Sequence, residues 1–158
     1  MTLISASPIQ QTPLLLIVED SNEDFEVLQR FLGRSSIAIP IQRCVNGEQA
    51  LAFLYRTGSY VDRKTPRPRL IVLDLNLPGT DGREVLRRIK QDNNLKMIPV
   101  VVFTTSSNPK DIEVCYQYGV NSYIVKPINF AQLKRDVQIL VEYWFEVTTL
   151  PDGPEDWS

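Results

Sequence analysis

The chain has 158 residues, of which 43% are hydrophobic and 23% charged, with 17 Lys and Arg against 19 Asp and Glu. These proportions predict one globular domain, and they exclude a disordered or coiled-coil body and a protein drawn by its overall charge to nucleic acid or an anionic membrane. The chain has no His, which excludes Ser-His-Asp, Cys-His and His-metal chemistry and a role as a phosphohistidine donor.

Targeting and cysteine signals favour a cytoplasmic protein. The first 13 residues lack the basic start and long apolar centre of a secretory signal, and no run approaches the roughly 20 apolar residues of a membrane span. Two cysteines, Cys44 and Cys115, are too few for a disulfide framework and lack zinc-ligand spacing. We therefore expect reduced thiols, a cytoplasmic location and no membrane partner.

Short apolar runs alternate with segments of helical period, a pattern that predicts βαβ units around a parallel sheet. The first strand is expected at residues 14–19, and the helix after it ends at Gly33. The second strand is expected at residues 39–45, where Asn46-Gly47 turns the chain into a second helix. The first third of the chain therefore reads as two strand-helix pairs.

A long irregular connection follows the second helix. Residues 57–69 contain a Gly, two Pro and five charged residues, and they exceed the usual length of a connection in such folds. The basic part, residues 63–69, is interpreted as a solvated loop, with a patch that docks a partner as the alternative.

The pattern of strand and helix resumes after this connection. The third strand, residues 70–74, is apolar without alternation, which is typical of a central parallel strand covered on both faces. Asp81 can cap a third helix. The fourth strand is expected at residues 99–104, and Asn108-Pro109 opens a fourth helix.

The fifth strand is expected at residues 122–125, and the last helix at residues 130–147. This helix carries a second apolar set outside its core stripe, and two interpretations stay open. The helix either overhangs the sheet and covers an edge, or offers an apolar face to another chain. For the second case, a homodimer through strand five and this helix, the candidate anchors are Tyr143, Trp144 and Phe145.

The predicted organisation is a flexible N-terminal segment at residues 1–13, one domain at residues 14–147 and a flexible acidic tail at residues 148–158. The residues after the last helix are too few for a helix-turn-helix unit. We therefore expect no nucleic-acid contact and an output that passes through another protein.

Four strand ends carry residues that could handle a phosphate or a metal. Taken alone, an acid pair or a lone Asp after a strand is usually a helix cap or a turn, and Lys-Pro is usually a solvated corner. Parallel strands, however, bring their carboxyl ends to one edge of the sheet, so that these residues can meet. In chain order they are Glu19-Asp20, Asp74, Thr104 and Lys126.

This set of side chains suits phosphoryl transfer to a carboxylate. Asp74 is the candidate phosphoacceptor, because a carboxylate can attack phosphorus once the repulsion between two anions is neutralised. A hard divalent cation such as Mg²⁺ neutralises it and prefers oxygen ligands. Asp20, supported by Glu19, and Asp74 are the candidate ligands, together with the main-chain carbonyl of Asn76. Mn²⁺ or Ca²⁺ could replace Mg²⁺.

Lys126 and Thr104 complete the candidate site. The Lys126 ammonium can meet phosphoryl oxygens as a point charge, and the Thr104 hydroxyl can bond one of them once phosphate is present. Each residue then has a separate electrostatic role.

With these motifs the chain resembles the receiver domains of response regulators, the CheY-like family of two-component signalling. The resemblance implies an α/β fold, a doubly wound five-stranded parallel sheet in the order 2-1-3-4-5. It also implies a cis peptide between Lys126 and Pro127, and a switch in which Tyr123 follows the Thr104 hydroxyl when phosphate arrives. The long connection and the aromatic last helix resemble the small stand-alone receivers of cyanobacterial phytochromes.

The resulting hypothesis is a single-domain response regulator that accepts a phosphoryl group on Asp74 from a histidine kinase, of the phytochrome type. It is not a turnover enzyme, because its only reactions are its own phosphorylation and dephosphorylation. One alternative is a pseudo-receiver, an interaction module that does not need phosphate. Another is an aspartate-nucleophile phosphohydrolase, which usually has a second acid where this chain has Asn76.

Overall fold

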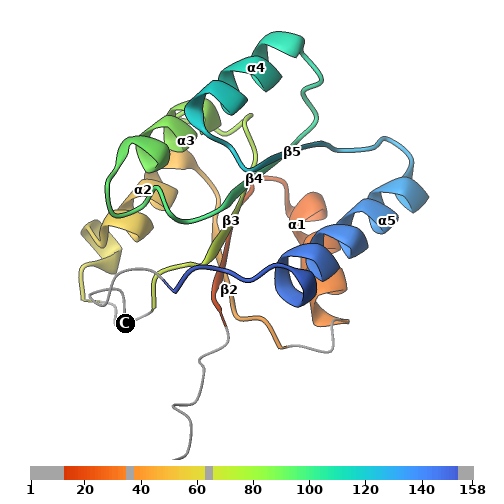
Figure 1. Ribbon diagram of the computed structural model, residues 1–158, viewed down its shortest axis with the longest axis horizontal. Coiled ribbons are helices and arrows are strands. Elements are labelled where there is room, and N and C mark those ends of the chain that lie inside the picture. Colours follow the sequence, from red (N-terminus) through yellow and green to blue (C-terminus); the bar gives the residue numbers. More distant parts are fainter. Residues whose placement is uncertain (1–12, 35–37, 63–65, 153–158) are drawn as a thin grey trace, which may run out of the picture.

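The computed structural model describes residues 13–34, 38–62 and 66–152, and Figure 1 draws the remainder in grey. Most of the N-terminal segment predicted to be flexible, and residues 153–158 of the predicted tail, lie outside the described residues.

A five-stranded parallel sheet forms the centre of the protein, in the order β2-β1-β3-β4-β5 (Figure 1). The predicted fold class and strand order are therefore confirmed. Several strands are a residue or two shorter than their apolar runs. Their bounds are β1 Leu15–Val18, β2 Ile41–Cys44, β3 Leu70–Leu73, β4 Val100–Thr104 and β5 Ser122–Val125.

Helices cover both faces of the sheet, with α1 and α5 on one face and the other three on the opposite face (Figure 1). Each begins at an Asn, Ser or Asp whose side chain accepts a hydrogen bond from a backbone N–H of the first turn. No helix in the described part of the chain is both long enough and apolar enough to cross a membrane. The bounds are α1 Asn22–Gly33, α2 Gly47–Tyr55, α3 Gly82–Gln91, α4 Pro109–Tyr118 and α5 Phe130–Val141.

The core consists of two apolar layers, one on each face of the sheet. Alternate residues of the central strands contribute to opposite layers: Leu16 packs toward α2, α3 and α4, whereas Leu15 and Ile17 pack toward α1 and α5. All residues of β1, β3 and β4 are buried, as expected for parallel strands covered on both sides.

The connection after α2 packs against that helix. It contains a short 3₁₀ helix, η1 (Gly58–Tyr60), and the Tyr60 ring meets Phe53 edge to face with 5.2 Å between centroids. Arg67 donates a hydrogen bond from Nη1 to the carbonyl of Leu54. Residues 63–65 of the basic run lie outside the described residues.

The last helix differs from the predicted single α-helix. After α5 the chain continues as a π-helical turn, η2 (Glu142–Val147), and then returns to the sheet. Arg69 donates to the carbonyls of Leu150 and Pro151 at 3.1 and 3.2 Å, and Leu150 is buried. The first residues of the predicted tail are therefore held against the start of β3.

Lys90 joins three segments at the end of the sheet opposite the strand ends that carry the polar residues. Its Nζ donates to the carbonyls of Lys96 and Ile98 and to Oδ1 of Asn121, at 2.9–3.1 Å. We expect Lys90→Met to lower the free energy of unfolding by about 2 kcal/mol, because hydrogen bonds from a charged group are lost and their acceptors lose their donor. Urea denaturation measures this loss.

Lys96→Met is the matched control, since Lys96 lies in the same region but its side chain is exposed. A change of less than about 0.5 kcal/mol in Lys90→Met, as usual for surface substitutions, would contradict the structural role of Lys90.

Candidate functional site

The polar residues predicted to meet do so at the carboxyl ends of the strands. Glu19 follows β1, Asp74 follows β3, Thr104 ends β4 and Lys126 follows β5. In the described part of the chain, these four are the only polar or charged residues that are buried. Buried charges are rare unless they are paired or functional, so their gathering at one edge marks this edge as the candidate site.

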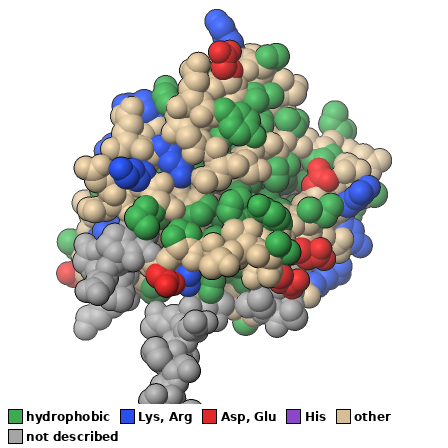
Figure 2. All heavy atoms as spheres, viewed as in Figure 1, with side chains coloured by type: hydrophobic (Ala, Val, Ile, Leu, Met, Phe, Trp, Pro, Cys, Tyr) green, Lys and Arg blue, Asp and Glu red, His purple; other side chains and the backbone are tan. Residues whose placement is uncertain are grey.

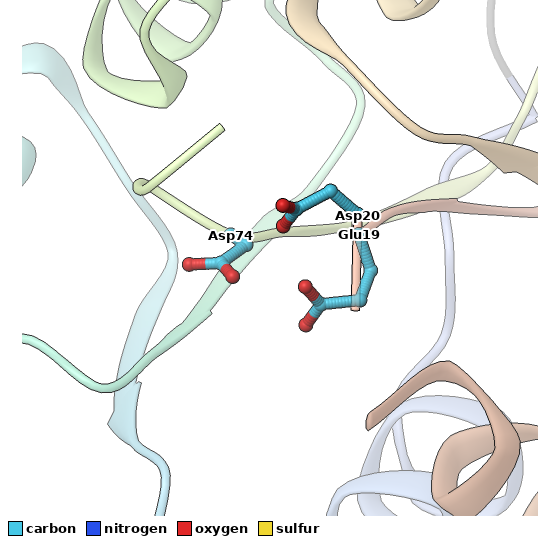
Figure 3. A group of neighbouring side chains, drawn as sticks. All are labelled: Glu19, Asp20 and Asp74. Atoms are coloured by element: carbon cyan, nitrogen blue, oxygen red, sulfur yellow. The ribbon is translucent and has the colours of Figure 1, made fainter. Parts of the chain in front are cut away.

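Three carboxylates form a cluster at this edge. Glu19, Asp20 and Asp74 each offer an oxygen, and these oxygens lie within 4.8 Å of one another. Figure 3 shows Glu19 and Asp20 reaching from the end of β1 toward Asp74. Asp20 is exposed, whereas Glu19 is almost fully buried. An all-oxygen donor set of this kind, open to solvent on one side, fits a hard divalent cation that keeps several waters.

Lys126 is the only buried cation in the described part of the chain, and it faces three acids. Its Nζ lies 2.5 Å from Glu19 Oε1, 2.8 Å from Asp24 Oδ2 and 3.2 Å from Asp74 Oδ2. The reach of Lys126 to the phosphoacceptor candidate agrees with its predicted role. Asp24 was not predicted as a site residue; its position three residues after the capping Ser21 is a signal for a helix cap and not for a contact with Lys126.

Burial and pairing shift the ionisation of this cluster. Burial raises the pKa of Glu19 to about 8, against the opposing effect of Lys126. Burial also acts to raise the pKa of Asp74, but the hydrogen bond with Glu19 and the charge of Lys126 outweigh it, so the pKa of Asp74 is lowered. Burial disfavours the charged form of Lys126, yet its bonds to Asp24 and Glu19 raise its pKa. Asp74 and Lys126 are therefore ionised at neutral pH.

The loop after Asp74 is held close to it. The Asn76 N–H donates to Asp74 Oδ1 at 3.2 Å, which turns the chain directly after β3. Gly82, at the start of α3, lies so close that an added Cβ would be 2.2 Å from the Asp74 carbonyl oxygen. The glycine is thus required sterically where α3 starts. The carbonyl of Asn76 as a metal ligand stays a prediction.

The candidate switch residues are linked through Ser106. The Ser106 N–H donates to Thr104 Oγ1 at 3.4 Å, and the Tyr123 hydroxyl donates to the Ser106 carbonyl at 2.9 Å. Burial raises the pKa of the Tyr123 hydroxyl, which stays a neutral donor at physiological pH. A shift of the Thr104 hydroxyl toward Asp74 would therefore disturb the loop that Tyr123 contacts. The switch role of Thr104 and Tyr123 stays a prediction.

One expectation from the family resemblance is wrong. The peptide between Lys126 and Pro127 is trans, and no cis peptide occurs among the residues that the structure describes. Trans is the lower-energy form of an X–Pro bond, by about 0.5–1 kcal/mol. In this trans arrangement the Lys126 N–H donates to the Thr104 carbonyl at 2.7 Å while Nζ reaches the acids.

The candidate dimer contacts lie away from this site, in η2. Tyr143 is about half exposed, whereas Trp144 and Phe145 are partly buried and pack against the core layer beneath α1 and α5. The structure therefore brings the candidate phosphate-handling residues together and leaves this aromatic set separate from them.

An ion-pair network borders the site between α3 and α4. Arg83 donates from Nε and Nη2 to the two carboxylate oxygens of Asp111, both at 2.7 Å, and Asp111 Oδ2 also accepts from the Ser106 hydroxyl at 2.6 Å. These bonds lower the pKa of Asp111 to about 2, and the bond from Arg83 has the larger effect. The network holds Ser106, and with it the loop after β4 that the Tyr123 hydroxyl contacts.

This network predicts a pH dependence. Because the pKa of Asp111 is depressed in the folded state, its stabilisation is present above about pH 4 and is lost as the pH falls toward 2. We expect Asp111→Asn to lower the free energy of unfolding by about 1 kcal/mol at pH 7 and by almost nothing at pH 2. Urea denaturation across this range measures the difference, with Glu113→Gln on the same helix as control. A difference that persists unchanged at pH 2 would contradict the assignment.

The sheet order and the edge that joins an acid cluster to a buried lysine define the receiver of a two-component signalling pathway. The chain belongs to the response regulator receiver domain family, whose match spans residues 15–138. This class receives its signal from a histidine kinase.

Among its relatives, response regulator Rcp1 of Synechocystis sp. is 46% identical over 138 residues, which cover 87% of this chain and 92% of Rcp1. The probable methanogenesis regulatory protein FilR2 of Methanothrix harundinacea is 40% identical, over 89% of this chain and 88% of FilR2.

Two solved structures are close to this fold. The Mn²⁺-bound form of Rcp1 has a TM-score of 0.85 at 45% identity, covering 88% of this chain and 99% of that one. The phosphorylated cyanobacterial phytochrome response regulator RcpA has a TM-score of 0.84 at 42% identity, covering 89% and 99%. The acid cluster of this chain agrees with a family that binds divalent metal.

Proposed function

We propose that this protein accepts a phosphoryl group on Asp74 from the phosphohistidine of a histidine kinase and signals through the resulting change of conformation. The observation that carries this proposal is the position of Asp74. It lies between the carboxylates of the acid cluster and the ammonium of Lys126, the one buried cation in the described part of the chain. A divalent cation held by these carboxylates, together with the Lys126 ammonium, would place positive charge on both sides of the attacking oxygen, as an incoming phosphoryl group needs.

The roles of the residues follow from this arrangement. Asp74 is ionised and attacks phosphorus, and the bond between phosphorus and the imidazole nitrogen of the donor breaks. Mg²⁺, held by Asp20, Asp74 and the Asn76 carbonyl with Glu19 beside it, would neutralise charge on the transferred oxygens; Mn²⁺ or Ca²⁺ could replace it.

Lys126 and Thr104 act on the oxygens of the transferred group. Lys126 meets one oxygen as a point charge, and the Thr104 hydroxyl donates to another. Water later hydrolyses the acyl phosphate and restores Asp74. The phosphoryl chemistry is thus confined to the protein's own side chain, and the protein is not a turnover enzyme.

The alternatives have less support. A pseudo-receiver would not need the acid cluster and the buried lysine, both of which are present. An aspartate-nucleophile hydrolase usually has an acid two residues after the nucleophile, where this chain has Asn76, whose backbone is tied to Asp74. Rapid turnover of a small phosphate ester would favour the hydrolase.

The kinase that we propose is of the phytochrome type. This proposal rests on the relatedness to RcpA, which is described as a cyanobacterial phytochrome response regulator. A kinase of this kind phosphorylates its histidine with ATP, which agrees with the cytoplasmic location predicted for the receiver.

The test is phosphotransfer from purified kinases carrying radioactive phosphohistidine. We expect a light-regulated phytochrome kinase to label this protein in the presence of Mg²⁺ faster than unrelated histidine kinases do. Equal or slower transfer from the phytochrome kinase would contradict the pairing, and no transfer from any kinase would contradict the function itself.

We also propose a homodimer through β5 and the last helix. Figure 2 shows hydrophobic side chains in a band between α4 and α5 on the face that it presents. Ile139 and Tyr143 are each 51% exposed, and Val125 of β5 is 37% exposed. Tyr143, Trp144 and Phe145 remain candidate contacts, but the last two also pack internally, so Phe145→Glu would disturb folding as well.

Tyr143→Glu is therefore the sharper variant for this test. We expect the wild type to sediment as a dimer and Tyr143→Glu as a monomer, while Val61→Glu, in an exposed position after η1, leaves the dimer intact. A monomeric wild type, or an unchanged mass in Tyr143→Glu, would contradict the proposed contact.

A further inference from the structure

The first turn of α1 contains an incomplete capping box. Ser21 is the N-cap, and its hydroxyl accepts a hydrogen bond from the Asp24 N–H at 3.3 Å. In a complete capping box, the acid at this third helical position returns a bond to the N–H of the N-cap. Here Glu19 Oε2 takes that N–H instead, at 3.3 Å. The carboxylate of Asp24 is left available for another partner.

That partner is Lys126. Asp24 Oδ2 lies 2.8 Å from Lys126 Nζ, and the Asp24 side chain is 32% exposed, so the ion pair is partly shielded from water. A partly shielded pair is screened less than one on the open surface. The contact joins the start of α1 to the end of β5 across the mouth of the site.

The bonds of Lys126 account for all of its protons. An ammonium group has three N–H donors, and Lys126 Nζ lies within hydrogen-bonding distance of Glu19, Asp24 and Asp74. The bond to Asp74 is the longest, at 3.2 Å. A phosphoryl group on Asp74 would meet this third N–H, while the other two acids continue to hold the ammonium.

We propose that Asp24 is a positioning residue, which with Glu19 fixes the Lys126 ammonium so that one N–H is directed at Asp74. This inference rests on the proposed function and deepens it. Without Asp24, one N–H loses its acceptor and the long side chain of Lys126 regains rotational freedom. Displacement of a charge that has to meet the transferred group then slows phosphorylation.

The first measurement is the rate of phosphorylation by acetyl phosphate with Mg²⁺, followed by intact mass. We expect Asp24→Ala to be about tenfold slower than the wild type, an effect within the range that misplacement of a reacting group produces. Asp24→Glu, which keeps the charge, should recover part of the rate. Glu23→Ala, at an exposed acid in the same turn, controls for the charge and stability of α1.

The second measurement asks whether Asp24 acts through Lys126. In the wild-type background Asp24→Ala should lower the midpoint of urea unfolding, whereas in a Lys126→Met background it should leave that midpoint unchanged. The double-mutant comparison of urea unfolding midpoints does not depend on phosphoryl transfer or on a metal. It therefore tests the contact between Asp24 and Lys126 independently of the phosphorylation rate.

The outcomes separate this inference from the function on which it rests. A wild type that takes up no phosphoryl group would overturn the proposed function together with the role of Asp24. If the wild type is phosphorylated and Asp24→Ala is as fast or faster, only the role of Asp24 is overturned. The role of Asp24 alone is also overturned if Asp24→Ala lowers the urea unfolding midpoint equally with and without Lys126.

Discussion

Asp74→Asn is expected to take up no phosphoryl group from acetyl phosphate and Mg²⁺, whereas the wild type gains one. An amide at this position keeps the shape of the side chain and can still accept from the Asn76 N–H, so the loop after β3 should persist. It lacks the anionic oxygen that attacks phosphorus, and no other carboxylate of the cluster contacts both Lys126 and the Asn76 N–H. Intact-mass spectrometry measures the difference.

Asp62→Asn is a suitable control, because Asp62 is exposed in the connection after η1 and remote from the strand ends. This variant should be labelled like the wild type. Phosphorylation of Asp74→Asn at the wild-type level would place the acceptor on another residue and would contradict the account of the site.

Lys126→Met is expected to lower the free energy of unfolding more than any other substitution considered, and to lose phosphorylation as well. Lys126 is 8% exposed and contacts three acids; its removal leaves the buried Asp74 carboxylate without its cation and the buried Glu19 without its donor. Removal of one partner from a buried pair costs about 3–5 kcal/mol, and we expect a loss at the lower end because Asp24 is partly exposed. Urea denaturation without divalent metal measures this loss.

Mg²⁺ should stabilise Lys126→Met more than the wild type, because the bound cation then replaces the positive charge that Lys126 supplied to the acids. Lys110→Met, at an exposed position in the first turn of α4, serves as control and should change neither stability nor phosphorylation. A loss of less than about 1 kcal/mol in Lys126→Met would contradict the central place of this lysine in the cluster.

The sequence was sufficient to predict the sheet and the meeting of the candidate site residues at one edge, for a physical reason. The order of strands and helices follows from apolar runs and capping residues, and the parallel sheet then brings the ends of β1, β3, β4 and β5 to one edge. A prediction of this kind needs residue types and chain order only. Side-chain geometry does not enter into it.

The features that were missed depend on side-chain direction or on contacts between distant segments. The pattern from Ser21 to Asp24 is that of an ordinary capping box, and nothing in it reveals that Asp24 turns toward a lysine 102 residues away. Likewise, Arg69 looked like part of a solvated basic run, but it binds carbonyls 81 and 82 residues later in the chain.

Local backbone departures were also outside the reach of pattern analysis. Arg56 ends α2 in the left-handed conformation, with φ of 54°, where a Gly or Asn would have given a signal. The apolar residues of η2 fit a continued α-helix equally well, so the sequence pattern did not distinguish the π-helical turn from the predicted α-helix. The trans peptide before Pro127 corrected an expectation that came from resemblance and not from the residues themselves.

The central claim is that a phosphoryl group passes from a kinase phosphohistidine to Asp74. The most direct measurement incubates the wild type with a phosphorylated histidine kinase and Mg²⁺, reduces the acyl phosphate with borohydride, and maps the altered residue by peptide mass spectrometry. The account predicts reduction of Asp74 to homoserine and no other modified residue. A trapped modification at another carboxylate, or none in a protein that the kinase has labelled, would contradict it.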